Sequence, residues 1–158
     1  MRWLAKDTSL YIAEKQYVDT LVVLLVPIAF GDRTKESGND YEFLSLISSE
    51  LERQFQGRIL LFPPFIYPEN PSDSFKEVVF KELFRSIDSD FRHLFFISTK
   101  QDFKEQIDAV NGELFWMPSI PLEYVDEKNR RSIIEDQVRQ LSPLIVLRWQ
   151  EEERKLVP

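Results

Sequence analysis

The chain has 158 residues, of which 43% are hydrophobic and 30% charged, so it fits one globular domain with its own core. It contains no cysteine, which excludes disulfides, zinc–thiolate sites, iron–sulfur clusters and thiol nucleophiles. The formal net charge of -7 disfavours nucleic acids and anionic membranes as partners, because both bind a concentrated positive surface.

The N-terminus and the longest apolar stretch indicate where the protein is located. Residues 1–7 contain no apolar run followed by small residues, so they do not look like a signal peptide. Residues 21–30 form the longest apolar stretch, with about half the length that a helical membrane span needs. We therefore expect a cytoplasmic protein without membrane insertion.

Short apolar runs recur along the chain after a short helix predicted over residues 8–16. Each run has strand length, and none alternates polar with apolar residues, which is typical of parallel strands covered on both faces. The predicted strands are residues 21–28, 59–62, 94–97 and 114–117.

Amphipathic helices are predicted between the first three strands. Asn39 and Glu42 can form a capping box for the first helix, and Gly57 is placed to end it. Ser74 and Glu77 can form the capping box of the next helix. That second helix should stop near residue 88.

A third helix is predicted between the last two strands, with Thr99 as its cap and Asn111-Gly112 as its left-handed stop. A long helical segment follows over about 126–155. Within it, Ser142-Pro143 is either a kink or the start of another helix. Residues 144–149 keep the helical phase, with an edge strand as the alternative.

Alternating strands and helices predict one α/β domain over residues 1–158. We expect a three-layer sandwich of Rossmann-like or flavodoxin-like type, with a four-stranded, mainly parallel sheet in the order 2-1-3-4 and helices on both faces. Ligands of such sheets bind beyond the carboxyl ends of the strands, where the strand order reverses. Here that crevice lies between the first and third strands.

Two segments are predicted to face this crevice. Residues 31–40 follow the first strand and either present N–H groups and basic side chains to an anion or form a solvated turn. They fit neither a Walker A loop nor the three-glycine dinucleotide fingerprint. Residues 98–100 end the third strand and either contact an anion or cap a helix. The candidate ligand-binding residues are Asp32, Arg33, Lys35, Ser98, Thr99, Lys100 and Glu105.

No motif in the sequence predicts a particular catalytic reaction. His93 is the single histidine and begins the third strand, away from the crevice, which excludes a Ser-His-Asp triad or a multi-histidine metal site. The carboxylates, such as Asp32 and Glu105, have no spacing that singles out an acid–base pair. We expect no cofactor and no metal.

Apolar residues and prolines follow the predicted strands and indicate an apolar rim around the crevice. Pro63 and Pro64 come after the second strand, and residues 65–67 follow them. Trp116, Met117 and Ile120 would complete the rim. Such a rim suits a protein partner as well as a small ligand.

Three short segments carry a resemblance to a known family. They are Met1-Arg2-Trp3, Tyr17-Val18-Asp19-Thr20 before the first strand, and Phe115-Trp116-Met117-Pro118. On these residues the chain resembles, over nearly its whole length, the YpiF-like proteins of spore-forming bacilli. The resemblance implies a small cytosolic bacterial protein and transfers no active-site residue.

A second likeness, of architecture alone, is to TIR domains. Residues 40–52 are similar to the first helix of that family, and Ser98 followed by Glu105 is similar to the serine and catalytic glutamate of its NAD-cleaving members. The chain departs from the family because no Trp-Cys pair precedes Glu105.

These observations leave two main hypotheses for the function. The first is a non-catalytic module that binds an unknown protein partner or a small anionic ligand at the carboxyl-end rim. The alternative is an enzyme that acts on a nucleotide-like or phosphorylated small molecule, with Arg33, Lys35 and Lys100 holding the anion. A homodimer through Trp149 and the acidic residues 151–153 is a further possibility, although a helix covering its own sheet explains the same pattern.

Overall fold

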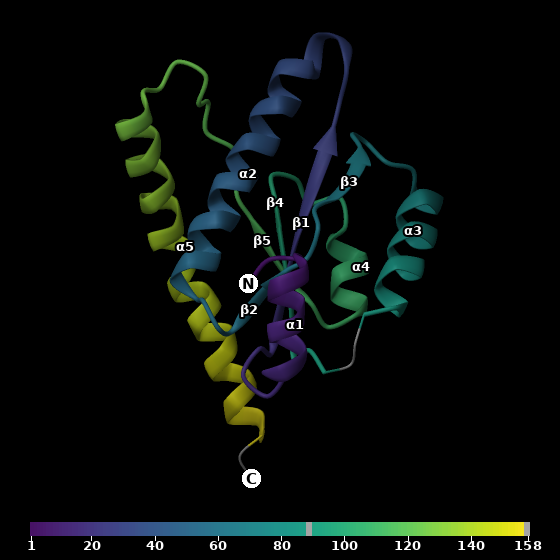
Figure 1. The fold of residues 1–158 in the computed structure, drawn as a ribbon. Coiled ribbons are helices and arrows are strands. Elements are labelled where there is room, and N and C mark those ends of the chain that lie inside the picture. The colour runs from purple at the N-terminus through teal and green to yellow at the C-terminus, as the bar shows by residue number, and fades with distance from the viewer. Residues whose placement is uncertain (88–89, 157–158) are drawn as a thin grey trace.

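In the computed structural model, which describes residues 1–87 and 90–156, a parallel sheet lies between two layers of helices (Figure 1). Helices α2 (Thr34–Gln54) and α5 (Glu127–Leu156) cover one face. Helices α1 (Ala5–Ala13), α3 (Asp73–Arg85) and α4 (Lys104–Ala109) lie on the other. The predicted α/β sandwich is confirmed.

The strands of the sheet pair in parallel throughout. The path β2-β1-β4-β5 is the predicted order of the four expected strands, and a short additional strand, β3, also pairs with β1. The strands are β1 (Thr20–Ile28), β2 (Ile59–Leu61), β3 (Phe65–Pro68), β4 (His93–Ser98) and β5 (Glu113–Trp116).

Strands β2 and β3 follow one edge of β1 and are separated by Pro63 and Pro64. Strand β2 pairs with residues 20–22 of β1, and β3 pairs with residues 25–28. A proline has no N–H to donate to a ladder, so two in succession interrupt the edge. Residues 65–67 were predicted only as part of an apolar rim, so this strand is an addition to the predicted sheet.

Strand β1 divides the core because its side chains alternate between the two faces of the sheet. Val22, Leu24 and Val26 pack with α2 and α5. Leu21 and Val23 pack with Phe80, Phe96 and other residues of the α3 and α4 side. Both faces are covered, which explains why the predicted strands contain no polar alternation.

The prediction of a loop over residues 31–40 is wrong, because the whole segment is helical. Gly31 takes a φ of 67° and turns the chain into a short 3-10 helix, η1 (Gly31–Arg33), and α2 begins directly after it. Asn39 and Glu42 therefore lie inside α2 rather than at its cap. Ser37 and Asp40 point inward and are buried, so this part of the helix is fixed by tertiary contacts.

Two other predicted helix starts are also displaced. Ser72 caps α3, since its Oγ accepts a hydrogen bond from the Phe75 N–H at 3.2 Å, and α3 thus begins before the predicted box at Ser74. Helix α3 ends at Arg85, and the predicted stop near Asp88 lies outside the described residues. Helix α4 begins at Lys104, so Thr99 is not its cap.

The predicted stop after α4 is confirmed at one of its two residues. Asn111 takes the left-handed conformation with a φ of 57°. Gly112 does not, and its small size has a different reason. A Cβ built there would lie 2.8 Å from Cε2 of Phe96, so the backbone can approach this ring only without a side chain.

Helix α5 is continuous through Pro143, and residues 144–149 are helical as predicted. A proline cannot donate to the carbonyl one turn earlier, and the neighbouring Ser142 Oγ hydrogen-bonds the Val138 carbonyl oxygen at 2.7 Å. Trp149 is buried against the sheet of its own chain and is not available to a second copy. Among the described residues, no helix combines the length and apolar character needed to cross a membrane.

Candidate functional site

A cleft of about 1080 Å³ opens beyond the carboxyl ends of β1 and β4. Residues 33–42 of η1 and α2 form one wall, Lys100 contributes from the end of β4, and residues 119–130 form the other wall. The strand order reverses between β1 and β4, so the cleft lies where parallel α/β sheets bind ligands.

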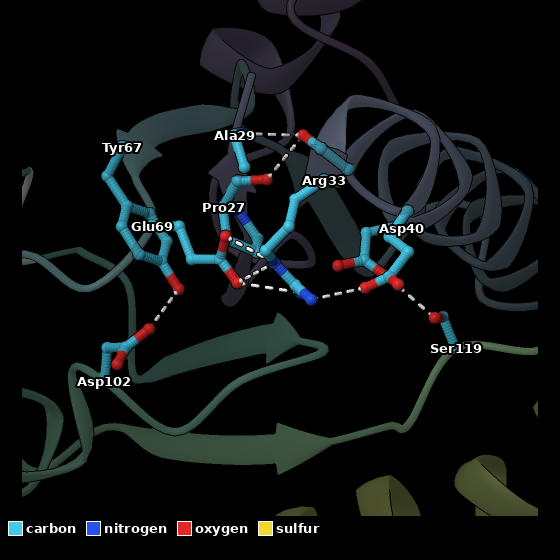
Figure 2. A network of polar contacts seen from close by, with 10 residues as sticks. Pro27, Ala29, Arg33, Asp40, Tyr67, Glu69, Asp102 and Ser119 are labelled. Carbon is cyan, nitrogen blue, oxygen red and sulfur yellow. Dashed lines mark hydrogen bonds and ion pairs between the residues drawn. The ribbon is translucent and has the colours of Figure 1, made fainter. Parts of the chain in front are cut away.

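Ser37 fixes α2 to the end of β1 beside the cleft. Its Oγ accepts a hydrogen bond from the Ala29 N–H at 3.0 Å and donates to the Pro27 carbonyl oxygen at 3.3 Å (Figure 2). One hydroxyl thereby satisfies two backbone groups where β1 leaves the sheet.

Asn39 and Asp40 join α2 to the opposite wall. The Asn39 amide donates to the Ile120 carbonyl oxygen at 3.0 Å and accepts from the Leu122 N–H at 2.9 Å. The Ser119 hydroxyl donates to Asp40 Oδ1 at 2.6 Å (Figure 2). These contacts hold the walls at a fixed separation, so the cleft is formed before any ligand arrives.

Arg33 is held by two carboxylates at the mouth of the cleft. Its Nε lies 2.9 Å and 2.8 Å from the two carboxylate oxygens of Glu69 (Figure 2). Its Nη1 lies 2.6 Å from a carboxylate oxygen of Glu36. The hydrogen bond from Arg33 lowers the pKa of Glu69, and the same bond raises the pKa of Arg33. The guanidinium is thus already neutralised.

Lys35 and Arg130 are paired in the same way. Lys35 forms an ion pair with Glu123 and lies 5.4 Å from the centre of the Tyr124 ring. The hydrogen bond from Lys35 lowers the pKa of Glu123. Arg130 lies 3.3 Å from Glu42 and donates to the Leu122 carbonyl oxygen.

Lys100 differs from these three cations because its ammonium forms no ion pair with any described residue. It is half-buried, and its backbone N–H donates to the Ser98 hydroxyl at 3.2 Å. The nearby charge of Lys100 contributes to the lowered pKa of Glu69. Lys100 therefore brings an unpaired positive charge to a wall of the cleft.

The structure brings together three of the predicted ligand-binding residues. Arg33, Lys35 and Lys100 all line the cleft, although only Lys100 is without an ion-pair partner in the described chain. Asp32 is exposed on η1 and is not part of the lining.

The other three predicted residues do not line the cleft. Ser98 is fully buried and donates to the Leu25 carbonyl oxygen at 2.8 Å. Thr99 is buried, and its hydroxyl has no hydrogen-bond partner among the described residues. Glu105 is exposed in the first turn of α4, on the other face of the sheet, so Ser98 and Glu105 are not presented to one ligand.

Several cleft residues were not in the predicted set, namely Asn39, Asp40, Ser119, Tyr124 and Arg130. Asn39 and Asp40 lie in the segment that was interpreted as a loop, from which only Asp32, Arg33 and Lys35 had been chosen as ligand-binding candidates. Ser119 and Arg130 carry no local signal, because they reach the cleft through the segment after β5.

A hydrogen-bonded pair, the buried Tyr67 and the half-buried Asp102, lies beside the network of Arg33 and Glu69. The Tyr67 hydroxyl donates to Asp102 Oδ2 at 2.9 Å (Figure 2). Burial, and then the charge of Asp102, raise the pKa of Tyr67 well above its ordinary value. Tyr67 therefore stays protonated, and this pair connects β3 to the loop before α4.

The amino-acid sequence matches a known protein family. Residues 9–149 match the family model described as a protein of unknown function (DUF2487). The chain belongs to the DUF2487 family. It is 28% identical over 149 residues to the uncharacterized protein YpiF of Bacillus subtilis (strain 168). The aligned residues make up 94% of this chain and 98% of that relative. The resemblance to YpiF-like proteins is thus confirmed.

The part matched by the DUF2487 model includes every residue that lines the cleft, from Arg33 to Arg130. The cleft therefore lies within the region that defines the family and not in an added segment. No solved structure matches this chain significantly. Within residues 1–87 and 90–156, no three histidine or carboxylate side chains gather as a metal-binding group.

Proposed function

We propose that this protein is a non-catalytic binding module that holds a small anionic ligand in the cleft between α2 and residues 119–130. We propose a Rossmann-like sheet, in which the ligand binds where the strand order reverses. We also propose that the protein is cytoplasmic, as the sequence predicts. The observation that carries the proposal is the ammonium of Lys100, which lines the cleft and forms no ion pair with any described residue.

The pattern of ion pairs in the cleft supports an anion as the ligand of Lys100. Arg33, Lys35 and Arg130 are each held by carboxylates of the chain, and Arg33 is held by both Glu36 and Glu69, so none of these three cations is free to pair with a ligand. Among the described residues that line the cleft, Lys100 is the cation that forms no ion pair, so the attraction for an anion is local to its ammonium and does not come from the net charge of the cleft. A phosphate or carboxylate group beside Lys100 would complete the pairing, and a charge-assisted hydrogen bond of this kind contributes about 1.5–3 kcal/mol.

The carboxylates of the cleft support binding rather than catalysis. A general acid at neutral pH needs a raised pKa, whereas the pKa values of Glu69 and Glu123 are lowered by their cationic partners. Asp40 accepts a hydrogen bond from Ser119, and Glu36 and Glu42 are ion-paired. These carboxylates stabilise the walls and are not placed to move protons.

A titration with defined anions tests the proposal. We expect inorganic phosphate, sugar phosphates or nucleoside monophosphates, screened at millimolar concentration, to raise the melting temperature of the protein, because a ligand that binds only the folded state stabilises it. For the ligand with the largest shift, Lys100→Ala should weaken binding by calorimetry about tenfold, which corresponds to about 1.4 kcal/mol.

Lys81→Ala is the matched control, since Lys81 is an exposed lysine on α3, away from the cleft. It should leave the affinity unchanged, and Lys100→Arg should retain most of it. If none of these anions stabilises the protein, or if both alanine variants weaken binding equally, the proposed site is wrong.

A further inference from the structure

Strand β5 is an open edge of the sheet. It pairs with β4 on one side, and no described strand pairs with its other side. The opposite edge is partly covered, because the Leu61 N–H of β2 donates to the Met1 carbonyl oxygen at 2.9 Å. An open edge presents unpaired N–H and C=O groups that can bind another strand.

The direction of these free groups follows from the pairing of β5 with β4. The Met117 N–H donates to the Ser98 carbonyl oxygen at 2.9 Å, so Met117 and Phe115 direct their backbone groups toward β4. Because this direction alternates along a strand, Leu114 and Trp116 direct theirs away from the sheet. Pro118 has no N–H, so it cannot donate to a further hydrogen bond on that side.

A groove of about 390 Å³ runs between this edge and α5, and its apolar side chains are unusually exposed. Leu144 is 52% exposed and Leu147 46% exposed. Trp116 is also 52% exposed at this edge, but side chains alternate along β5, so its ring lies on the opposite face of the sheet from Phe115, Met117 and α5. Large apolar side chains gathered beside an open strand edge are typical of a surface that another chain covers.

We propose that a second copy of this chain covers this surface, with β5 of each copy antiparallel to the other about a two-fold axis at Phe115. Leu114 of each copy then lies opposite Trp116 of the other, and each such pair exchanges both of its backbone hydrogen bonds. The two sheets become one continuous sheet. The proposal is independent of the anion cleft.

The position of α5 fits this axis. Arg148 lies 2.9 Å from Glu113 at the start of β5, whereas Gln137 and Pro118 line the other end of the groove. The part of α5 that lies beside Phe115 of β5 is therefore between Gln137 and Arg148, near Leu144. The same axis thus brings Leu144 of the two helices together, and both helices lie on one face of the joined sheet.

The charges of the groove favour a second copy despite the net charge of -7. The ionised lining residues, Glu113, Arg148 and Glu151, all lie at one end, and the other end is lined by uncharged residues such as Gln137 and Gln140. An antiparallel arrangement places the charged end of each copy against the uncharged end of the other. Like charges are then kept apart.

The size of the surface predicts a weak dimer. The groove is lined by thirteen residues, whereas a standard stable interface uses about 20–30 residues on each side. We therefore expect a dissociation constant in the micromolar range or above, and an equilibrium between monomer and dimer that depends on protein concentration.

Sedimentation equilibrium over about 1–500 µM protein tests the proposal. The mass of the unmodified chain should rise toward twice the monomer mass, and the double variant Leu144→Asp with Leu147→Asp should remain monomeric, because burying four carboxylates at the axis is unfavourable. Val78→Asp, at an exposed valine of α3, is the control and should dimerise normally.

A cross-link makes the geometry of the dimer testable as well. Because the chain has no cysteine, a single introduced thiol can form a disulfide only with a second copy. We expect Leu144→Cys to give a disulfide-linked dimer under mild oxidation and Val78→Cys to give almost none. A chain that stays monomeric at every concentration, or equal cross-linking of the two variants, would overturn the proposal.

Discussion

Gly112 lies between α4 and β5, where the backbone passes close to the ring of Phe96. A Cβ at this position would lie 2.8 Å from Phe96 Cε2 and 3.2 Å from the Leu94 carbonyl oxygen. Both groups belong to β4 and cannot move without disturbing the sheet. We expect Gly112→Ala to lower the free energy of unfolding by about 1–3 kcal/mol, measured by urea denaturation.

Gly38→Ala is the matched control for this prediction. Gly38 lies within α2, and a Cβ there would meet no atom within 4 Å. Alanine in a helix interior is more favourable than glycine, so this variant should be more stable by about 0.5–1 kcal/mol. Two variants that shift stability in the same direction would contradict the packing explanation for Gly112.

At the scale of elements, Trp149 fixes the C-terminal half of α5 to the sheet. Its Nε1 donates to Thr20 Oγ1 at 2.8 Å, and the Arg58 guanidinium lies 3.9 Å above its ring. Trp149→Phe keeps an aromatic ring but removes this donor from a buried site. We expect it to lower the free energy of unfolding by about 1–3 kcal/mol in chemical denaturation.

An exposed residue of the same helix provides the comparison. Gln150 is exposed, so Gln150→Ala should change the free energy of unfolding by less than about 0.5 kcal/mol. If Trp149→Phe has no larger effect than Gln150→Ala, the hydrogen bond to Thr20 does not stabilise the docked helix.

The elements that the sequence predicts correctly are those whose pattern is set by burial. The continuous apolar character of β1 and β4 and the apolar stripe of α2 reflect faces that pack against neighbours in the fold. These patterns also predict the strand order, since parallel strands with right-handed crossovers leave few arrangements.

The errors lie where a local signal competes with tertiary contacts. Asn39 resembles a helix cap in the sequence, but its amide bonds the backbone of Ile120 and Leu122 from inside α2. Pro63 and Pro64 resemble the end of a strand, but pairing with β1 resumes immediately after them as β3. In both cases the deciding partner lies far along the chain.

At the scale of the whole molecule, the topology of the sheet predicts where the cleft lies better than it predicts which residues line the cleft. The reversal of strand order is enough to locate it between β1 and β4. The contact between Asp40 and Ser119 joins residues 79 positions apart, and no spacing rule relates them. Lys100 could be predicted because it lies two residues beyond the end of β4, a strand that ends at the reversal.

We expect His93, which is buried at the start of β4, to contribute to the change in the free energy of unfolding with pH. Burial lowers its pKa below the ordinary 6.5, although Asp19, with Oδ2 3.9 Å from Nε2, acts in the opposite direction. Arg58 and Arg92 also oppose protonation, and Glu152 favours it. The folded state therefore holds this imidazole in its neutral form more strongly than the unfolded state does.

The sign of the effect follows from proton binding. Below pH 6.5 the unfolded chain protonates this histidine first, so protons favour unfolding, and the free energy of unfolding should fall as the pH falls through this window. We expect urea denaturation at about pH 7.5 and about pH 5.5 to show a smaller loss for His93→Gln than for the unmodified chain, because glutamine does not titrate. Both proteins share all other titratable groups, so the difference between their losses isolates His93. Equal losses would mean that the acid sensitivity comes from the carboxylates instead.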